Sequence, residues 1–273
     1  MARPFLKMNG LGNDFVVVET RSGPFAPTPA DVRAIADRTS GVGCDQLIAI
    51  DKAEDADARV RFWNADGEEV GACGNGTRCV GWLLMQSSGK DEAVIETRAG
   101  RLIATRAGER LVSVDMGPPG LDWDQIPLAA EHDTRALDVA LFDHPALSAA
   151  PGCVSMGNPH VVFFVDDVDA TPIATIGSAV EVHPLFPEHV NVGFAQVLAP
   201  DRIRLRVWER GAGLTQACGT GACAALVAAS RRDLVGRHAV MVLDGGELHI
   251  EWDDRGHVIM TGPAAVDFAG ELP

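Results

Sequence analysis

Two cysteines stand in matching positions before glycine-rich turns. Cys73 and Cys218 each follow an alanine and precede Gly-x-Gly, within Ala72–Gly76 and Ala217–Gly221. A helix that begins at each turn presents unpaired backbone N–H groups and the positive end of its dipole, which lower the pKa of a thiol from about 8.5 toward neutrality. The same N–H groups hold a carboxylate. The pattern therefore indicates acid–base chemistry on a substrate that carries a carboxylate.

The two motifs belong to an internal repeat. The cysteines lie 145 positions apart, and the same interval separates Gly12-Asn13 from Gly157-Asn158. The similar segments Arg59–Trp63 and Arg204–Trp208 each end ten residues before their cysteine. A constant interval over most of the chain indicates two similar halves, since chance seldom produces it.

The repeat predicts the domain organisation. We expect an N-terminal half over 1–120 that carries one cysteine and a C-terminal half over 150–273 that carries the other. The proline-containing segment 121–149 is the expected linker, and the sequence leaves open with which half it packs. In the first half, Thr28-Pro29-Ala30-Asp31 is typical of a helix start, with a capping hydroxyl, a proline and an acid in the first turn.

Each half is predicted to be a sheet around one helix. Charged and apolar residues alternate in Arg59–Phe62 and Arg202–Val207, the period of a half-buried strand, and Ala93–Met116 reads as short strands broken at glycines. The helix expected at Ala222–Ala229 is apolar on every side, which is typical of a helix enclosed by other structure. The predicted class is α+β, with two pseudo-symmetric halves.

Composition and charge exclude several kinds of partner. Lys plus Arg total 23 against 38 Asp plus Glu among 273 residues, and the resulting charge of −15 repels nucleic acid and anionic membranes. The N-terminal segment Met1–Lys7 lacks the apolar core of a signal peptide, and Gly211–Ser230, although uncharged, is too polar for a membrane span. Six cysteines without zinc-like spacing predict no metal site and a reducing, cytoplasmic location. We expect a small-molecule substrate as the partner.

Paired thiols suit one class of reaction. An approximate two-fold axis between the halves is expected to bring both thiols to one cleft, on opposite faces of a bound substrate. Removal of a proton from one face of a carbon and its return to the other is racemisation or epimerisation. One cysteine must then be a thiolate and the other a thiol. Helix N–H groups on the carboxylate stabilise the carbanion.

Other residues accompany the two cysteines. Glu209 and Arg210 precede Cys218 closely, and we interpret them as partners for an ammonium and a carboxylate rather than as a surface ion pair. His160 is equally consistent with a general base and with a core histidine. The remaining cysteines are predicted to pack as small apolar side chains; they are Cys44, Cys79, Cys153 and Cys223.

With these residues in place, the sequence closely resembles the diaminopimelate epimerase family over nearly its whole length. The resemblance is carried by Met8–Phe15, Gly41–Gln46, Asn64–Gly67, Cys73–Cys79, Gly157–His160, Glu209–Gly213 and Cys218–Gly221. It implies an enzyme without a cofactor that interconverts LL- and meso-diaminopimelate in lysine and peptidoglycan precursor synthesis. It also implies a homodimer and, in each half, a curved mixed sheet or barrel around a central helix.

The resemblance implies roles for particular residues. Cys73 and Cys218 become the two acid/base thiols, supported by His160 and Glu209. Side chains that hold the substrate, mostly at its distal end, are Asn13, Gln46, Asn64, Asn158, Asn191, Glu209 and Arg210. Backbone groups at Gly74, Asn75, Gly219 and Thr220 hold the reacting carboxylate. The sequence departs from the family pattern at Leu214, where Glu is frequent, and at Asn9, where His is frequent.

The sequence bears on three other functions. A proline racemase or hydroxyproline epimerase also uses paired cysteines, but its substrates lack a distal group for Glu209 and Arg210 to bind. An amino-acid-binding protein without activity does not need both thiols. A pyridoxal phosphate racemase needs a Schiff-base lysine, and the lysines of this chain, Lys7, Lys52 and Lys90, lie in no motif that indicates one.

Overall fold

The computed structural model describes residues 3–147 and 149–272, which form two compact units. The chain passes from unit 1 to unit 2 between Asp115 and Met116, and it returns to unit 1 between Met260 and Thr261. Residues of the expected linker therefore lie in unit 2, while the last strand of the expected second half lies in unit 1. These units are defined by contacts, whereas the halves 1–120 and 150–273 are defined by the repeat and stay a prediction.

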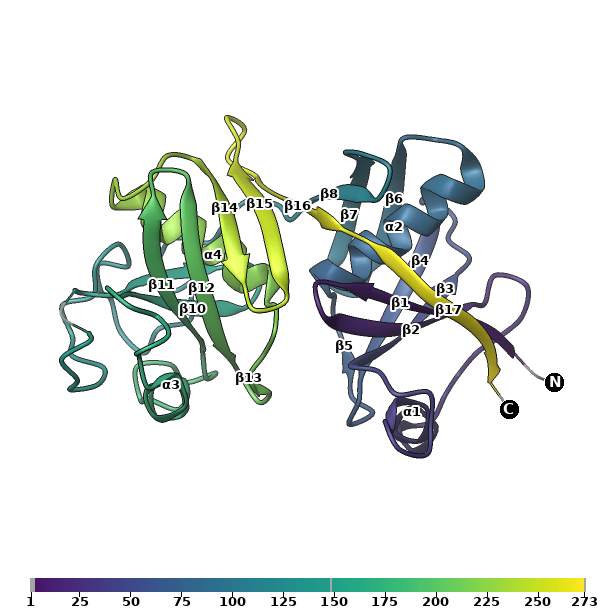
Figure 1. Cartoon of the computed structure of the whole chain (residues 1–273), viewed down its shortest axis with the longest axis horizontal. Coiled ribbons are helices and arrows are strands. Elements are labelled where there is room, and N and C mark those ends of the chain that lie inside the picture. Colours follow the sequence, from purple (N-terminus) through teal and green to yellow (C-terminus); the bar gives the residue numbers. More distant parts are fainter. Residues whose placement is uncertain (1–2, 148, 273) are drawn as a thin grey trace. The chain divides into compact units, whose positions relative to one another are not determined.

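Unit 1 is a mixed sheet that curves around helix α2 (Gly74–Ser88) (Figure 1). From one edge its neighbouring strands are β17 (Ala265–Leu272), β1 (Arg3–Gly10), β2 (Asn13–Glu19), β3 (Gln46–Asp51), β4 (Ala58–Asn64), β6 (Glu92–Thr97), β7 (Gly100–Arg106) and β8 (Leu111–Asp115). The short strand β5 (Glu69–Val70) pairs with β4. The β2–β3 and β4–β6 pairs are parallel and the other pairs are antiparallel.

Unit 2 repeats this arrangement around helix α4 (Gly219–Arg231). Its neighbouring strands are β9 (Gly152–Ser155), β10 (Pro159–Phe164), β11 (Asn191–Ala199), β12 (Arg202–Glu209), β14 (His238–Leu243) and β15 (Gly246–Trp252), with β13 (Gly213–Leu214) beside β12. Strand β16 (Val258–Pro263) crosses from unit 2 to unit 1. In each unit two strands, a helix, three strands and a second helix follow one another, which confirms the predicted α+β class.

Local sequence signals correctly predict helices α1 (Pro29–Ala36) and α4 but not α3 (Ile173–Glu181). Helix α4 is buried on all sides, as its composition predicts, and α1 begins at the expected capping box of Thr28 and Asp31. Helix α3 was not predicted, because it begins without a side-chain cap. Its side chains at Ile176 and Val180 are fully buried, so tertiary packing stabilises it. Among the described residues, none of the helices combines the length and the apolar character needed to cross a membrane.

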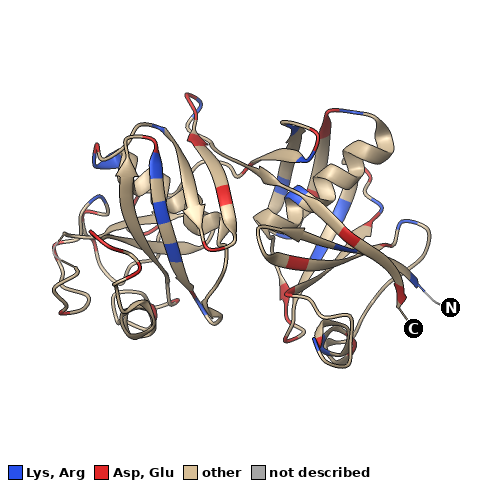
Figure 2. Ribbon diagram, viewed as in Figure 1, with Lys and Arg blue, Asp and Glu red and all other residues tan. Residues whose placement is uncertain are grey.

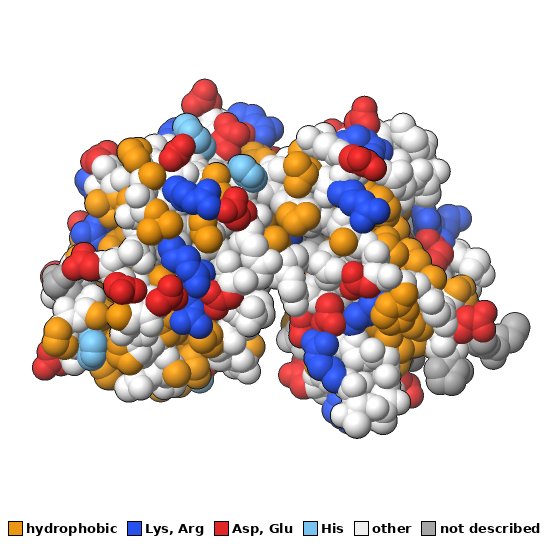
Figure 3. All heavy atoms as spheres, in the orientation of Figure 1, with side chains coloured by type: hydrophobic (Ala, Val, Ile, Leu, Met, Phe, Trp, Pro, Cys, Tyr) orange, Lys and Arg blue, Asp and Glu red, His pale blue; other side chains and the backbone are white. Residues whose placement is uncertain are grey.

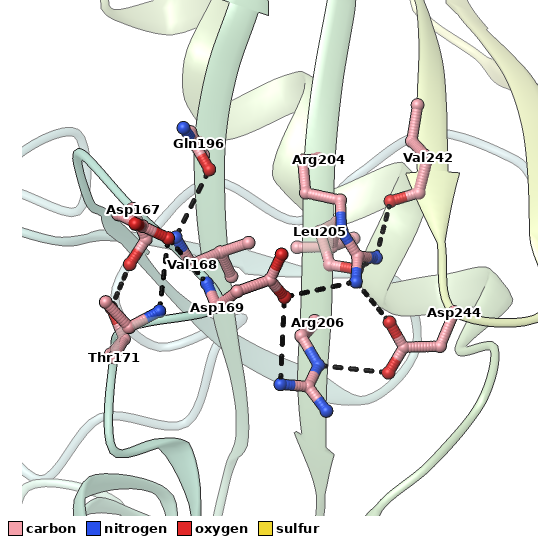
Figure 4. A network of polar contacts seen from close by, with 11 residues as sticks. Asp167, Val168, Asp169, Thr171, Gln196, Arg204, Leu205, Arg206, Val242 and Asp244 are labelled. Atoms are coloured by element: carbon pink, nitrogen blue, oxygen red, sulfur yellow. Dashed lines mark hydrogen bonds and ion pairs between the residues drawn. The ribbon is translucent and has the colours of Figure 1, made fainter.

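Charged side chains line the outer face of β12. Figure 2 shows the positions of the basic residues along this strand in blue. Arg204 and Arg206 both contact the carboxylate of Asp244, with 3.0 Å from Arg206 Nε to Oδ2, and Arg204 also lies 3.4 Å from Asp169 (Figure 4). Acidic and basic side chains are interspersed over this face of unit 2 (Figure 3). The arginines are therefore ion-pair partners that join β12 to β14 and to a neighbouring loop.

Helix α3 lies so close to β12 that Gly177 has no room for a side chain. A Cβ at this position would lie 2.6 Å from Cβ and Cγ of Trp208. We expect Gly177→Ala to lower the free energy of unfolding by about 1–3 kcal/mol, although alanine favours a helix over glycine by about 1 kcal/mol. Urea unfolding measures the change. Gly236→Ala is the control, since nothing lies within 4 Å of its Cβ position, and equal stability of the two variants would contradict the expectation.

Candidate active site

Cys73 is the N-cap residue of α2. Its backbone is extended, and Sγ accepts a hydrogen bond from the Gly76 N–H at 3.4 Å. The Thr77 N–H and hydroxyl both donate to the Cys73 carbonyl, at 2.7 and 2.8 Å, and fix the first turn. The sulfur therefore lies at the helix N-terminus, where the dipole stabilises a negative charge.

The Asn13 amide lies between Cys73 and a carboxylate. Its Oδ1 is 3.9 Å from Cys73 Sγ and 3.5 Å from Asn75 Nδ2, while its Nδ2 donates to Asp45 Oδ2 at 2.8 Å. An ionised carboxylate only accepts hydrogen bonds, so Asp45 fixes which way the amide points. Asp45 was not predicted as a site residue. It acts on a neighbouring side chain, and only its place directly before Gln46 in the sequence could have indicated it.

Cations contact Asp45 and its neighbour Asp14. Arg38 lies 2.9 Å from Asp14 and 2.7 Å from Asp45, and Lys7 lies 2.6 Å from Asp14. Burial raises the pKa of Asp14, but hydrogen bonds from Arg38 and Lys7 together lower it by more. The pKa of this carboxyl is therefore well below its usual value. The Asp14 carboxylate therefore stays charged near neutral pH.

Arg78 supports the same turn from inside the core. Its side chain is completely buried, and NH1 donates to Asn75 Oδ1 at 2.8 Å while Nε donates to the Pro263 carbonyl at 3.4 Å. Because guanidinium groups only donate, Asn75 must turn its oxygen to Arg78 and its nitrogen to Asn13. The sequence did not predict this contact, since Arg78 is charged and lies in a helix that otherwise reads as core.

Gln46 and Asn64 form a second polar pair in unit 1. They are register partners on β3 and β4, and Gln46 Nε2 donates to Asn64 Oδ1 at 2.8 Å. The Gln46 Oε1 is buried and accepts no hydrogen bond from the described residues. A buried acceptor of this kind is suited to a donor on a bound ligand, because leaving it unsatisfied costs about 1–3 kcal/mol.

In unit 2, Cys218 is the N-cap residue of α4 and is only 4% exposed. Burial raises the pKa of this thiol well above its ordinary value, and contact with the Glu209 carboxylate raises it further. The Thr220 hydroxyl lies 3.7 Å from Sγ, and the Thr215 hydroxyl donates to Glu209. Cys218 is therefore protonated here and donates toward Glu209.

His160 reaches this site through a chain of hydrogen bonds. Asn158 Nδ2 donates to the Thr220 hydroxyl at 3.3 Å, and His160 Nε2 lies 3.1 Å from Asn158 Oδ1. An amide oxygen only accepts, so the imidazole carries its proton on Nε2. Burial, and then the charge of Arg210, lower the pKa of His160 to about 3. The structure therefore places a neutral histidine beside Asn158.

The protonation state of His160 can be measured. We expect no titration of its ring between pH 5 and 8, because a buried imidazole with a pKa of about 3 stays neutral throughout that range. The test is the ring carbon and proton shifts in an NMR titration, with the resonance assigned by its loss in His160→Asn. A midpoint between pH 5.5 and 7.5 would show that the imidazole is charged in part of the working range.

Asn191 and Arg210 form the last predicted pair. Asn191 begins β11, and its Oδ1 accepts from the Arg210 N–H at 2.9 Å while its Nδ2 donates to the Pro159 carbonyl at 3.0 Å. Arg210 NH1 donates to the Glu188 carbonyl at 2.8 Å. Asn191 lies 145 positions after Gln46, and both residues begin the strand that follows the first helix of their unit.

Some of the predicted residues contact the cysteine of their unit, namely Asn13 in unit 1 and Glu209 and Thr220 in unit 2. The other four cysteines are buried. Burial raises the pKa of Cys44 to about 11 and that of Cys79 to about 12, which keeps both as inert thiols. Within residues 3–147 and 149–272, no cluster of three or more potential ligand side chains is arranged to hold a metal ion.

The fold defines a class of two-unit α+β protein. One solved member is a hydroxyproline epimerase from Agrobacterium vitis with bound trans-4-hydroxy-L-proline, with a TM-score of 0.69 and 17% identity over 99% of this chain and 92% of that one. Another is a phenazine biosynthesis protein of the PhzF family from Bacillus anthracis, with a TM-score of 0.69 and 15% identity over 100% and 99%. At these identities the likeness shows the fold alone.

Sequence comparison gives the particular family. The family model of diaminopimelate epimerase matches residues 5–121 and 152–266. The diaminopimelate epimerase of Phenylobacterium zucineum is 82% identical over 273 residues, which cover 100% of this chain and 99% of that protein. That of Caulobacter vibrioides strain NA1000 is 62% identical, with 100% and 98% covered. The chain belongs to the diaminopimelate epimerase family, which confirms the resemblance seen in its motifs.

Proposed function

We propose that this isomerase interconverts LL- and meso-diaminopimelate by a two-base mechanism, in which one cysteine removes a proton from Cα and the other donates a proton to the opposite face, in lysine and peptidoglycan precursor synthesis. The observation that carries the proposal is that a chain of this family places a cysteine at the N-terminus of the central helix of each unit. The reaction needs no cofactor, because two thiols and two helix N-termini supply the acid, the base and the carbanion stabilisation.

The helix N-termini receive the reacting carboxylate. The backbone N–H groups of Gly74 and Asn75 and those of Gly219 and Thr220 lie in first turns without acidic side chains. Helix N-termini bind anions by these N–H groups and by the dipole. As the Cα proton leaves, negative charge spreads onto the carboxylate, so the same N–H groups stabilise the carbanion more than the substrate.

The thiols move the proton. In the direction that starts with Cys218 protonated, Cys73 acts as a thiolate and takes the proton from one face of Cα, and the Cys218 thiol delivers its proton to the opposite face. Glu209 supports the protonated form of Cys218 at the start. The enzyme ends with a Cys73 thiol and a Cys218 thiolate, which is the state that catalyses the reverse reaction. His160 stays neutral and orients Asn158, so we assign it a supporting role.

Polar side chains hold the rest of the substrate. We assign the free Gln46 oxygen and the Glu209 carboxylate to an ammonium group, and the Arg210 guanidinium to the distal carboxylate. Amide groups complete the set of binding side chains, at Asn13, Asn64, Asn158 and Asn191. A substrate with two amino-acid ends matches this supply of donors and acceptors.

Isotope exchange tests the proposal. In deuterium oxide with a reductant, the enzyme should exchange the Cα hydrogen of LL-diaminopimelate and produce the meso isomer, while L-proline and trans-4-hydroxy-L-proline remain unchanged. Mass spectrometry measures the exchange and chiral chromatography the isomers. Exchange of proline without exchange of diaminopimelate would favour the racemase alternative, which has only a distant likeness of fold behind it. No exchange with any of these three amino acids would favour the alternative of an amino-acid-binding protein without activity.

We also propose that the protein works as a homodimer in the cytoplasm, as the family resemblance implies. A reducing compartment keeps both thiols available for proton transfer. Sedimentation equilibrium at micromolar concentration should give twice the mass of the 28.9 kDa chain, and the single-chain mass would refute the dimer.

A further inference from the structure

Helix α3 contacts the turn that carries Glu209 and Arg210, between β12 and β13 (Figure 1). The last residue of this helix, Glu181, places one carboxylate oxygen on each side of that dipeptide. Oε2 accepts from the Trp208 indole N–H at 2.7 Å, and Oε1 accepts from the Gly211 N–H at 2.9 Å. One side chain therefore holds the residue before and the residue after the pair.

The hydrogen bond to Gly211 selects one form of the turn. Ala212 N–H donates to the Glu209 carbonyl at 3.0 Å, which closes a four-residue turn, and Gly211 has a φ of +73°. Positive φ at the third residue alone is typical of a type II turn. Rotation of the peptide between Arg210 and Gly211 toward a type I turn would direct a carbonyl oxygen at the carboxylate in place of the N–H. Glu181 therefore stabilises the type II form.

Trp208 is fixed from the same helix. Gly177 lies one turn before Glu181, on the same helix face, and its missing side chain admits the Trp208 residue at close range. The indole ring also lies 3.6 Å from the Cβ position of Gly213 on the far side of the turn. The ring, the carboxylate and the turn thus form one packed assembly.

Unit 1 contains a counterpart with different chemistry. Arg33 on α1 donates to the Asp66 carbonyl at 2.9 Å, in the turn that follows Asn64. Gly67 in that turn has a φ of +96°, and its Cβ position lies 2.7 Å from the Pro29 carbonyl oxygen at the start of α1. In both units the first helix therefore holds the turn after the fourth strand, although the sequences of these helices show no repeat.

We propose that Glu181 is a positioning residue that holds the Glu209–Arg210 turn in the form that binds the distal end of the substrate. The inference rests on the proposed function for its consequence in catalysis. The structural part of the inference, that Glu181 holds the turn in one form, rests on the two hydrogen bonds and the packing described above.

Two variants test, without an activity measurement, whether Glu181 holds the turn. Glu181→Gln keeps the shape but places an amide N–H against one of the two donors, and Glu181→Ala removes both acceptors. We expect the Gly211 amide hydrogen to exchange at least about tenfold faster in each variant, measured by NMR or by mass spectrometry of the turn peptide. An unchanged exchange rate in both variants would overturn the proposal.

Kinetics tests the consequence. We expect Glu181→Gln to raise KM for diaminopimelate about tenfold and to change kcat less than about threefold, because the turn binds the non-reacting end. In an Arg210→Met background the same change should raise KM less than it does in the wild type, since only the Glu209 part of the turn is then left to position. Glu131→Gln, which removes a carboxylate from an exposed position of unit 2, is the charge-matched control.

The outcomes separate the two proposals. An equal rise of KM in the wild-type and Arg210→Met backgrounds, or a fall in kcat alone, would overturn the positioning role. If the wild-type enzyme does not act on diaminopimelate, the proposed function fails, and the exchange rate of the Gly211 amide still decides whether Glu181 holds the turn.

Discussion

Replacement of either Cys73 or Cys218 by alanine is expected to reduce kcat for interconversion of LL- and meso-diaminopimelate by about 10²- to 10⁴-fold. Each variant lacks the group that takes or delivers the proton on one face of Cα. Chiral chromatography under reducing conditions measures the interconversion rate, and circular dichroism verifies the fold.

Isotope exchange in the same variants tests the assignment of one thiol to each face. A variant that keeps one thiol can still remove the Cα hydrogen of one isomer and return deuterium to the same face. We therefore expect each alanine variant to exchange one stereochemical centre without inversion, and the two variants to prefer opposite centres. Exchange of the same centre by both variants would contradict the two-thiol mechanism.

A matched control lies in the same helix. Cys79 is fully buried in α2, and burial raises its pKa to about 12, so it cannot exchange protons with a substrate near neutral pH. Cys79→Ala should keep kcat within about twofold below its unfolding temperature, with a loss of stability near 1 kcal/mol for the small cavity. A loss of kcat as large as that of Cys73→Ala would show that the cysteine effects report on packing of the helix.

The repeat made most of the fold predictable. It located the strands around Arg59–Phe62 and Arg202–Val207 and the two central helices, because spacing and apolar composition are local signals. The return of β17 to pair with β1 has no local signal, since it joins the two ends of the described chain. Because of this pairing, unit 1 includes the last strand of the chain, whereas the repeat assigns that strand to the second half.

The candidate site likewise contains residues that have a sequence signal and residues that have none. Cys73 and Cys218 could be selected from their spacing alone, whereas an asparagine beside a glycine reads as ordinary turn chemistry, and Asn13 was selected only through the family resemblance. Asp45 and Glu181 could not be predicted, because each acts on another residue of the site. In the sequence, a lone carboxylate of this kind cannot be distinguished from an acidic residue on the solvated surface.

Arg210 gives the largest expected effect on substrate binding. Removal of the guanidinium in Arg210→Met leaves the distal carboxylate without its charged partner, and a hydrogen bond to a charged group contributes about 1.5–3 kcal/mol. We therefore expect KM for diaminopimelate to rise about 30-fold, with a smaller change in kcat. Steady-state kinetics with both isomers measures the two parameters.

Two comparisons show whether the loss comes from this charge pair. Arg210→Lys keeps the charge but not the planar fork, so its KM should lie between those of the wild type and Arg210→Met. Arg202→Met, which removes an arginine of β12 that pairs with Glu247 of β15, should leave KM unchanged.

With a 2-aminodicarboxylate substrate the distal carboxylate is still present, and Arg210→Met should again raise KM. With a 2-amino acid that ends in a methyl group, the difference between wild type and Arg210→Met should vanish, because there is no carboxylate for the guanidinium to bind. A difference that persists with the methyl-ended substrate would mean that Arg210 acts on the shape of the turn and not on the distal carboxylate.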